Sequence, residues 1–571
     1  MCIRDRTIID HDYDAIVVGS GISGGWAAKE LCEKGLKTLV LERGRMVKHR
    51  DDYPTANLDP WDMPHGGKTP ADILEKDYFK QKRWGVNEGN RHFYNKDSDY
   101  SYDEIKPFDW IRGTQVGGRS IIWGKQTYRW SDLDFEANAR DGYGVDWPVR
   151  YKDIAPWYSY VEKFIGVSGQ ALGLRQLPDS EFLPPMDLNC LEKHLQQSIA
   201  STYTDERVLT IGRVAHITEG TKPGDGRSTC QNRNRCDRGC PFGAYFSANS
   251  STLPVAQATG NLTIRPHSIA AEVLFDQDTQ KATGIRVIDT ETKEELVFTA
   301  KLIFLNASAI GTASLLMRSK SERFPNGMGN DSGELGHNIM DHQLGSGAGG
   351  KYDGFKDSYY KGRRPNGFYI PRFRNLDNKS EKVDFLRGYG YQGGASRGDW
   401  SRVIAEYQYG ANLKEAILDV GDWSIGMGGF GEVLPYHENH IKLNYDKLDQ
   451  YGMPTIVFDA EFKENEKRMK EDWKVQAAEM LENAGVKDVN IYDSNAPIGK
   501  GIHEMGTARM GKDPKTSVLN KFNQMHAVKN VFATDGSFMT SSATQNPSLT
   551  YMAFTARAVN YAVDALKKGE I

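Results

Sequence analysis

The first informative stretch of the chain changes from a strand pattern to a helix pattern and back. The apolar run at 15–18 predicts a buried strand, and apolar residues recur at helical spacing between Ser23 and Lys34. Gly35 is well placed to end this helix, and residues 38–42 predict a second strand. This order predicts a βαβ unit, so an α/β fold is expected.

The same two periods predict further elements along the chain. Residues 262–305 predict strands with a hairpin turn near 276–281, and the Gly- and Tyr-rich residues 346–460 predict a mainly antiparallel second domain. Residues 51–105 have little periodicity and are expected to form a long, lid-like insertion. A further strand is expected at 301–306, and helices at 151–165, 310–318, 461–484 and 549–567.

Composition and charge exclude several classes of protein. The 571 residues are 39% hydrophobic and 26% charged, which is typical of a globular protein. The formal charge of −4 argues against nucleic acid as the partner. No stretch approaches the ~18 apolar residues of a membrane span. Residues 1–6 lack the apolar core of a secretory signal, so export would depend on another chain.

The turn after the first predicted strand has the spacing of a dinucleotide-binding loop. Gly19 allows the tight turn, Gly21 lets backbone amides approach a pyrophosphate, and Gly24 permits close packing of helix on strand. Glu42, at the end of the second strand, can accept hydrogen bonds from a ribose hydroxyl. The unit therefore predicts nucleotide binding, but it does not distinguish NAD from FAD.

Three of the six cysteines fall within eleven residues. Cys230, Cys236 and Cys240 have the spacing C-x5-C-x3-C-P, and a proline after the last cysteine is common in ferredoxin-like loops. Positively charged neighbours are expected to lower the pKa of these thiols; they are Arg227, Arg233, Arg235 and Arg238. An iron–sulfur cluster, a zinc ion, a disulfide with one spare thiol and three unligated cysteines remain alternatives, although the loop offers no histidine to zinc.

Several blocks together resemble the glucose–methanol–choline (GMC) oxidoreductases, in the family's order, from residue 13 to about 563. They are the glycine loop with Glu42-Arg43-Gly44, Val116 to Gly124, Asn306 to Leu316, Gly333 to His342, His503 to Gly511, Thr534 to Ser537 and Thr544 to Thr550. The resemblance implies FAD rather than NAD. Some pyranose oxidases link FAD covalently through a histidine where this chain has Ile122, so non-covalent FAD is expected.

The resemblance also implies roles for individual residues. His503 matches the active-site histidine and Asn546 the second active-site position. A histidine with an ordinary pKa near ~6.5 can take the hydroxyl proton while hydride leaves for the flavin. His337 and His342 are expected to be structural, and His440 has no assigned role. Among the expected cofactor contacts, Arg43 lies beside Glu42. The flavin ring is expected to contact Gly117, Gly118, Ser120 and Trp123. The pyrophosphate–ribityl region is expected to contact Asp535 and Gly536, and the pyrimidine edge Asn546 and Pro547.

Within the family, the cysteine loop resembles that of bacterial sugar dehydrogenase catalytic subunits, which bind a 3Fe-4S cluster through three cysteines. The resemblance implies electron transfer to a cytochrome c, a small export or chaperone subunit, and a periplasmic location, with the cytoplasm as the alternative. The chain also resembles glucoside 3-dehydrogenase subunits, which implies oxidation of a secondary sugar hydroxyl, C3 favoured. The alternatives are a dehydrogenase that oxidises glucose at C1 or gluconate at C2, a sugar oxidase that uses dioxygen, and a non-redox lyase of the same fold.

The expected architecture is α/β (α+β overall), a discontinuous Rossmann-like FAD-binding domain with an inserted, mainly antiparallel substrate domain. The expected parts are residues 8–50, 106–130, 255–345 and 497–571 for FAD, 131–205 and 346–496 for substrate, 51–105 as insertion, and 225–248 as the cysteine-rich loop.

Overall fold

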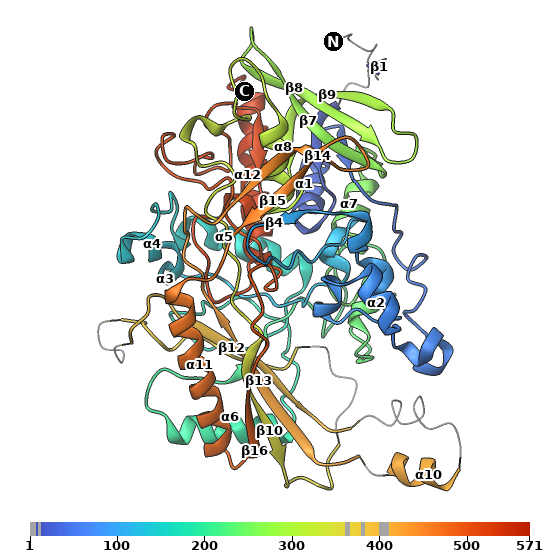
Figure 1. Cartoon of the computed structure of the whole chain (residues 1–571), viewed down its shortest axis with the longest axis vertical. Helices are drawn as coiled ribbons and strands as arrows, with labels where there is room; N and C mark the ends of the chain where they lie inside the picture. Colours follow the sequence, from blue (N-terminus) through green and yellow to red (C-terminus); the bar gives the residue numbers. More distant parts are fainter. Residues whose placement is uncertain (1–6, 9–12, 360–365, 378–382, 399–409, 419) are drawn as a thin grey trace.

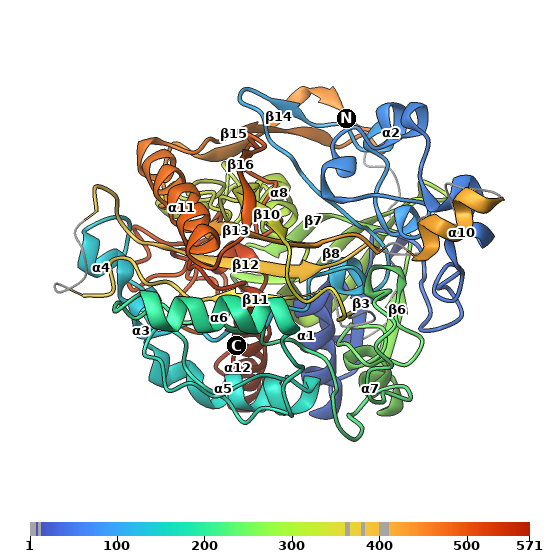
Figure 2. The same ribbon diagram turned by 90° about the horizontal axis from the view of Figure 1, so that it is seen from below.

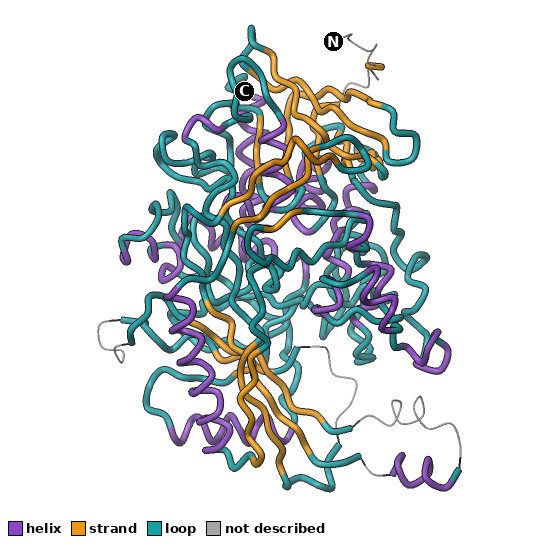
Figure 3. The backbone as a smooth tube through the Cα atoms, viewed as in Figure 1, coloured by secondary structure: helices purple, strands orange, loops and turns teal. Residues whose placement is uncertain are grey.

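A mixed sheet and an antiparallel sheet organise the two parts of the protein, one above the other in Figure 1. The computed structural model describes residues 7–8, 13–359, 366–377, 383–398, 410–418 and 420–571. Residues 1–6, where no secretory-signal pattern is found, lie outside this range, as do parts of the expected substrate domain. The strands of the two parts form separate groups in Figure 3.

The mixed sheet contains the predicted βαβ unit. Its strand order is β6-β3-β2-β9-β8-β7, with β1 and β17 also paired to β9. The strands β2, β3, β6, β9 and β17 are parallel, whereas β7 and β8 are antiparallel, so the predicted hairpin is confirmed. The bounds are β1 Thr7–Ile8, β2 Tyr13–Val18, β3 Thr38–Leu41, β6 Leu262–Arg265, β7 Ser268–Asp276, β8 Lys281–Asp289, β9 Glu295–Leu305 and β17 Val531–Ala533.

Both faces of this sheet are buried. Because successive side chains of a strand point to opposite faces, alternate residues of β2 pack in different cores. Ala15 and Val17 pack in a core with α1 and α12, whereas Ile16 and Val18 pack in the larger core on the other side. Helix α5 packs on α12, so residues 151–165 lie with the mixed sheet rather than with the substrate sheet, where the sequence pattern had grouped them. The helices are α1 Ile22–Glu33, α5 Tyr151–Ile165, α7 Thr252–Ala258, α8 Ala309–Arg318 and α12 Ser548–Lys567.

The second sheet is antiparallel, with the order β16-β10-β13-β12-β11-β5. Helices α6 and α11 lie beside it in Figure 2 and share its hydrophobic core. Glycines in β13 allow α11 to approach closely, since a Cβ on Gly429 would lie 2.6 Å from the Trp473 ring. The bounds are β5 Thr210–Ile211, β10 Ser346–Tyr352, β11 Phe368–Ile370, β12 Tyr389–Ser396, β13 Trp423–Gly431, β16 Lys487–Asp493, α6 Cys190–Thr202 and α11 Glu464–Asn483.

A small third sheet joins two distant segments. It has the order β14-β15-β4, with β14 His440–Leu448, β15 Pro454–Asp459 and β4 Asp103–Glu104. Residues 440–459 therefore lie apart from the substrate sheet, although the sequence pattern placed them in that domain. Among the described residues, further α-helices are α2 Ala71–Asp77, α3 Asp132–Phe135, α4 Ala137–Asp141 and α10 Ala411–Leu418. Across the described ranges, no helix has the length and apolar character needed to cross a bilayer.

Trp473 is expected to be a main stabilising contact between α11 and the antiparallel sheet. Its side chain is fully buried, so Trp473→Ala should lower the free energy of unfolding by about 3–5 kcal/mol in urea titrations. Val475→Ala, on the same helix but 57% exposed, is the control and should change it by less than about 0.5 kcal/mol. Equal effects of the two substitutions would contradict this view of the packing.

Candidate active site

A cavity of about 350 Å³ contains the glycine loop after β2 and also the expected reactive pair. Most of the residues expected from the sequence line it, namely Gly19, Gly21, Glu42, Arg43, Gly118, Ser120, Trp123, His503, Asp535, Gly536 and Asn546. Gly24, Gly117 and Pro547 do not line it. The sequence-predicted residues, although spread over the chain, therefore meet around one cavity.

Gly24 and Gly117 act through packing rather than through the cavity wall. A Cβ on Gly24 would lie 1.9 Å from the Gly19 carbonyl oxygen, and a Cβ on Gly117 would lie 1.6 Å from Asn249 Oδ1. Gly21, in contrast, has no atom within 4 Å of a Cβ position, which leaves its backbone open to a ligand. Glu42 accepts hydrogen bonds from Ser20 and from the backbone of Gly44, which fixes its carboxylate at the loop.

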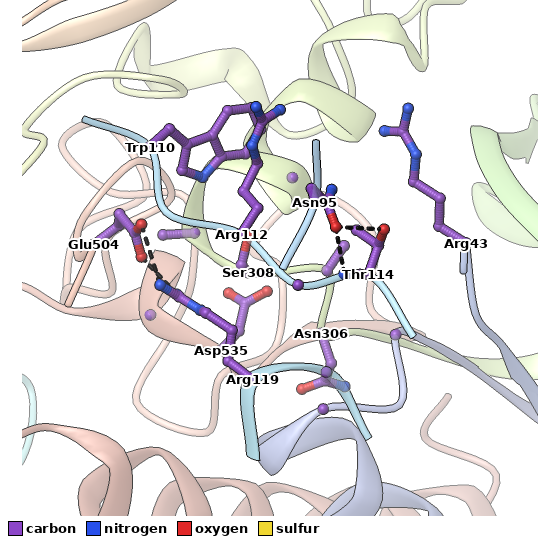
Figure 4. A pocket seen from close by; sticks show the side chains of 18 of the residues that line it. Arg43, Asn95, Trp110, Arg112, Thr114, Arg119, Asn306, Ser308, Glu504 and Asp535 are labelled. Carbon is purple, nitrogen blue, oxygen red and sulfur yellow. Dashed lines mark hydrogen bonds and ion pairs between the residues drawn. The ribbon is translucent and has the colours of Figure 1, made fainter. Parts of the chain in front are cut away.

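The polar groups of the wall fit a dinucleotide such as FAD. Five lining side chains have a buried nitrogen or oxygen without a hydrogen-bond partner among the described residues: Arg43 Nε, Asn95 Nδ2, Arg112 Nε, Asn306 Nδ2 and Tyr551 OH. Buried polar groups are normally paired, so these atoms indicate a polar ligand. Figure 4 shows several of them around the pocket. FAD, which has phosphates, hydroxyls and a polar ring edge, would supply the partners.

The region 51–105 and the β14–β15 hairpin complete the wall. Tyr100 and Tyr102 from the first and Met453 and Ile456 from the second line the cavity. Cations stack on these aromatics, with Arg43 Cζ 4.8 Å from the Tyr100 ring centroid. Because irregular segments carry no hydrophobic period, the sequence pattern could not assign this role to them.

One carboxylate shapes the loop that presents His503. Asp341 accepts backbone hydrogen bonds from Gly499 (2.8 Å), Gly501 (2.8 Å) and His503 (2.9 Å). Between the last two, Ile502 has φ 58°, a left-handed conformation that is costly for a β-branched residue. The three hydrogen bonds therefore stabilise a strained turn that directs His503 into the cavity.

His342, which is expected from the sequence to have only a structural role, contacts His503 directly. The His503 Nδ1 and His342 Nδ1 atoms are 3.0 Å apart, and His342 Nε2 lies 2.6 Å from the Ala543 carbonyl oxygen. A carbonyl only accepts, so His342 Nε2 carries the proton and its Nδ1 is an acceptor. His503 therefore donates from Nδ1, which leaves the lone pair of its Nε2 free to act as a base.

Burial keeps both imidazoles neutral. Desolvation, followed by the nearby His342 and Arg119, lowers the pKa of His503 well below its usual 6.5. Desolvation also lowers the pKa of His342 to about 4. Arg119 itself is compensated by Glu504, with Nη2 and Oε2 2.7 Å apart, as Figure 4 shows. Burial, followed by the charge of Glu504, raises the pKa of Asp341 to about 7.

The cysteine loop brings its three thiols into one neighbourhood. Cys236 interacts electrostatically with both Cys230 and Cys240, and Lys125 interacts with Cys236 and Cys240. His216, from outside the loop, places Nε2 3.7 Å from Cys236 Sγ, a neighbour that the loop sequence did not reveal. Cys236 and Cys240 therefore lie near one buried lysine, and Cys230 lies near Cys236.

The expectation that the loop arginines lower the thiol pKa is wrong for Cys236. Burial raises the pKa of this thiol to about 12, outweighing the charge of Lys125. Three of the arginines instead fasten the loop to residues 56–59: Arg233 donates to the Ala56 carbonyl, Arg235 pairs with Asp59, and Arg238 donates to the Leu58 carbonyl. The fourth, Arg227, interacts electrostatically with Cys240.

The arrangement of the loop fits neither a disulfide nor a single-ion site. The five cysteines that the structure describes form no disulfide. A tetrahedral zinc ion would hold its sulfur ligands about 4 Å apart. Within the described residues, the cysteines form no group of three ligand atoms that all lie within 4.8 Å of one another, even with His216. A larger centre of several metal ions holds its sulfur ligands farther apart.

The cysteine loop is attached to the cavity wall. Trp123, which lines the cavity, donates from Nε1 to the Phe246 carbonyl at 2.9 Å. Two residues later, Lys125 donates from Nζ to the Cys236 carbonyl at 2.9 Å. The segment 121–125 therefore lies between the cavity and the cysteines.

Comparisons with known proteins agree with this geometry. Family models described as GMC oxidoreductase match residues 13–344 and 435–555. The chain is 27% identical to 2-methyl-1,2-propanediol dehydrogenase of Mycolicibacterium austroafricanum over 96% of this chain and 94% of that protein. It is 24% identical to the fructose dehydrogenase large subunit of Gluconobacter japonicus over 97% of this chain and 98% of that protein.

Among solved structures, pyridoxine 4-oxidase from Mesorbium loti has the same fold, with a TM-score of 0.60 and 15% identity over 96% of this chain and 99% of that one. The matched family models cover most of the chain, including the glycine loop and the His503 segment. The chain therefore belongs to the GMC oxidoreductase family and is an FAD-dependent oxidoreductase that acts on CH–OH donors.

Proposed function

We propose that this protein is a dehydrogenase that oxidises a secondary hydroxyl of a sugar or glycoside to a ketone, with C3 favoured. The observation that carries the proposal is the pair formed by His503 Nε2 and Asn546 Nδ2, 3.5 Å apart at the cavity. The preference for C3 rests on the resemblance to glucoside 3-dehydrogenase subunits. The matched fructose dehydrogenase supports a sugar as the substrate.

The pair supplies what alcohol oxidation requires of the protein. The Asn546 amide N–H donates to the substrate hydroxyl oxygen, and His503 Nε2 accepts the hydroxyl proton. FAD, when bound, would accept the hydride from the carbon, so the alcohol loses one proton to His503 and one hydride, which is two protons and two electrons in total. Because His503 Nδ1–H remains bonded to His342, the resulting imidazolium stays oriented.

Other lining residues favour a neutral sugar. Trp84 and Trp123 offer aromatic faces, and Gln126 offers an amide that can bond hydroxyls. The charge of Arg119 is balanced by Glu504, so it is not available to bind a sugar acid. This balance disfavours gluconate relative to a glycoside.

We propose further that Cys230, Cys236 and Cys240 hold a 3Fe-4S cluster. Their common neighbourhood and the adjacent Lys125 and Arg227 charges fit an anionic cluster. A cluster, when bound, transfers electrons singly, which favours a cytochrome c over dioxygen as acceptor. A matched relative is named as a large subunit, which supports a multi-subunit assembly. The proposals of a small export or chaperone subunit and of a periplasmic location rest on the resemblance of the cysteine loop alone.

His503 is expected to be the base for flavin reduction. In air-free mixing with methyl glucosides or disaccharides, the wild type should bleach its flavin, and His503→Ala should do so at least about 100-fold more slowly. His437→Ala, an exposed histidine, is the control and should match the wild type. Absence of bleaching with any sugar would refute the sugar assignment, and an unchanged rate in His503→Ala would show that His503 is not the base.

The pH profile should show the lowered pKa of His503. Because the base works in its neutral form, a pKa well below 6.5 keeps it active as the pH falls through 6.5. The measurement is kcat/KM for flavin reduction between pH 8 and pH 5. Complete loss of the rate at pH 5, with an apparent pKa near 6.5, would contradict this environment. A partial decline would not, because Asp341, whose pKa is raised to about 7, also titrates in this range.

Cys236→Ser separates the electron relay from the oxidation of substrate. We expect purified variant to lose iron and acid-labile sulfide, to keep sugar-driven flavin reduction, and to lose reduction of cytochrome c. Cys190→Ser, outside the loop, is the control. Wild-type protein purified without air that contains no iron, but consumes dioxygen with sugar, would instead establish a sugar oxidase.

A further inference from the structure

A line of hydrogen bonds leads from the antiparallel sheet to the reactive pair. Gln392, on β12, donates from Nε2 to Asn546 Oδ1 at 2.7 Å. Gln126 donates from Nε2 to Gln392 Oε1 at 3.1 Å, and Tyr128 donates its hydroxyl to Gln126 Oε1. Together with His342 and His503, these side chains form one continuous network.

The Ala543 carbonyl fixes the direction of the whole network. Because it only accepts, His342 must donate to it, and His503 must in turn donate to His342. The lone pair of His503 Nε2 then requires a donor, which turns the Asn546 amide N–H toward it. Asn546 Oδ1 consequently faces Gln392 and requires a donor there as well. Every hydrogen bond of the network is therefore donated in the same direction, from Tyr128 toward the Ala543 carbonyl.

We propose that Gln392 is a positioning residue that holds the Asn546 amide with its N–H, rather than its oxygen, toward the substrate hydroxyl. The proposal rests on His503 and Asn546 being the reactive pair. Gln392 does not line the cavity, so it acts through Asn546. An inverted amide would present Oδ1 to the hydroxyl, and the hydroxyl proton would then point to Oδ1 instead of His503 Nε2.

The orientation is open to reversal, because an amide can turn about its last bond and exchange nitrogen for oxygen at similar shape. Once a substrate hydroxyl occupies His503 Nε2, the partner on the far side, Gln392, is the group that distinguishes the two orientations. Gln392 has both a donor and an acceptor, and Gln126 occupies its acceptor. The choice for Asn546 is thus made by Gln392, a residue of the second sheet that does not line the cavity.

Gln392→Glu tests the orientation directly. An ionised glutamate only accepts, so it should draw the Asn546 N–H away from His503 and slow flavin reduction by about 10- to 100-fold at pH 8. When protonated, glutamate can donate again, so the rate should recover as the pH falls toward 5. The wild-type rate should not rise over this range. A residue with only a structural role would not reverse the pH dependence.

Two variants serve as comparisons. Gln392→Met has similar length but no donor, so it should be slow at every pH. Gln197→Glu, exposed on α6, adds the same charge away from the site and should match the wild type. FAD content is measured for each variant, and if Gln392→Glu does not retain FAD, the uncharged Gln392→Met decides the question.

Full activity in Gln392→Met, or a Gln392→Glu rate that follows the wild-type profile, would overturn the proposal. The experiment uses whichever alcohol bleaches the wild-type flavin fastest, including simple diols. Failure of every sugar would therefore refute the proposed substrate class, while the role of Gln392 would still be decided with another alcohol.

Discussion

The Asp341 carboxylate is the contact on which the reactive site depends. It accepts three backbone hydrogen bonds from the turn at 499–503 and so stabilises the left-handed backbone of Ile502. Within the turn itself, the Ile502 N–H also donates to the Gly499 carbonyl oxygen at 3.0 Å. Since His503 follows directly, its side chain reaches His342 and Asn546 only while the turn keeps this shape.

The site is assembled from two scaffolds with different tasks. The mixed sheet supplies the glycine loop and the polar wall for FAD, and its packing requires glycines where helix and strand approach. The antiparallel sheet supplies Gln392, which reaches Asn546 just before α12. Binding of the cofactor and orientation of the reactive amide are therefore set by separate parts of the fold, which meet at one cavity.

In the cysteine loop, too, two tasks are carried out by different residues. Its arginines, expected from the sequence to act on the thiols, mostly fasten the loop to residues 56–59. A buried cation that interacts with two of the thiols is instead Lys125, which lies two residues after Trp123 of the cavity wall. A single short segment thus connects the wall of the cavity with the thiols that we propose as cluster ligands.

The sequence by itself determined the local features of this protein: the βαβ unit, the long helices, the hairpin at 276–281, and His503 and Asn546 as candidates. These depend on periodicity and on short motifs, which are properties of neighbouring residues. Only the tertiary structure decided the roles of His342, Asp341 and Gln392 and of the region 51–105. Their contacts join residues more than 150 positions apart, and hydrogen bonds over that separation leave no period or spacing in the chain.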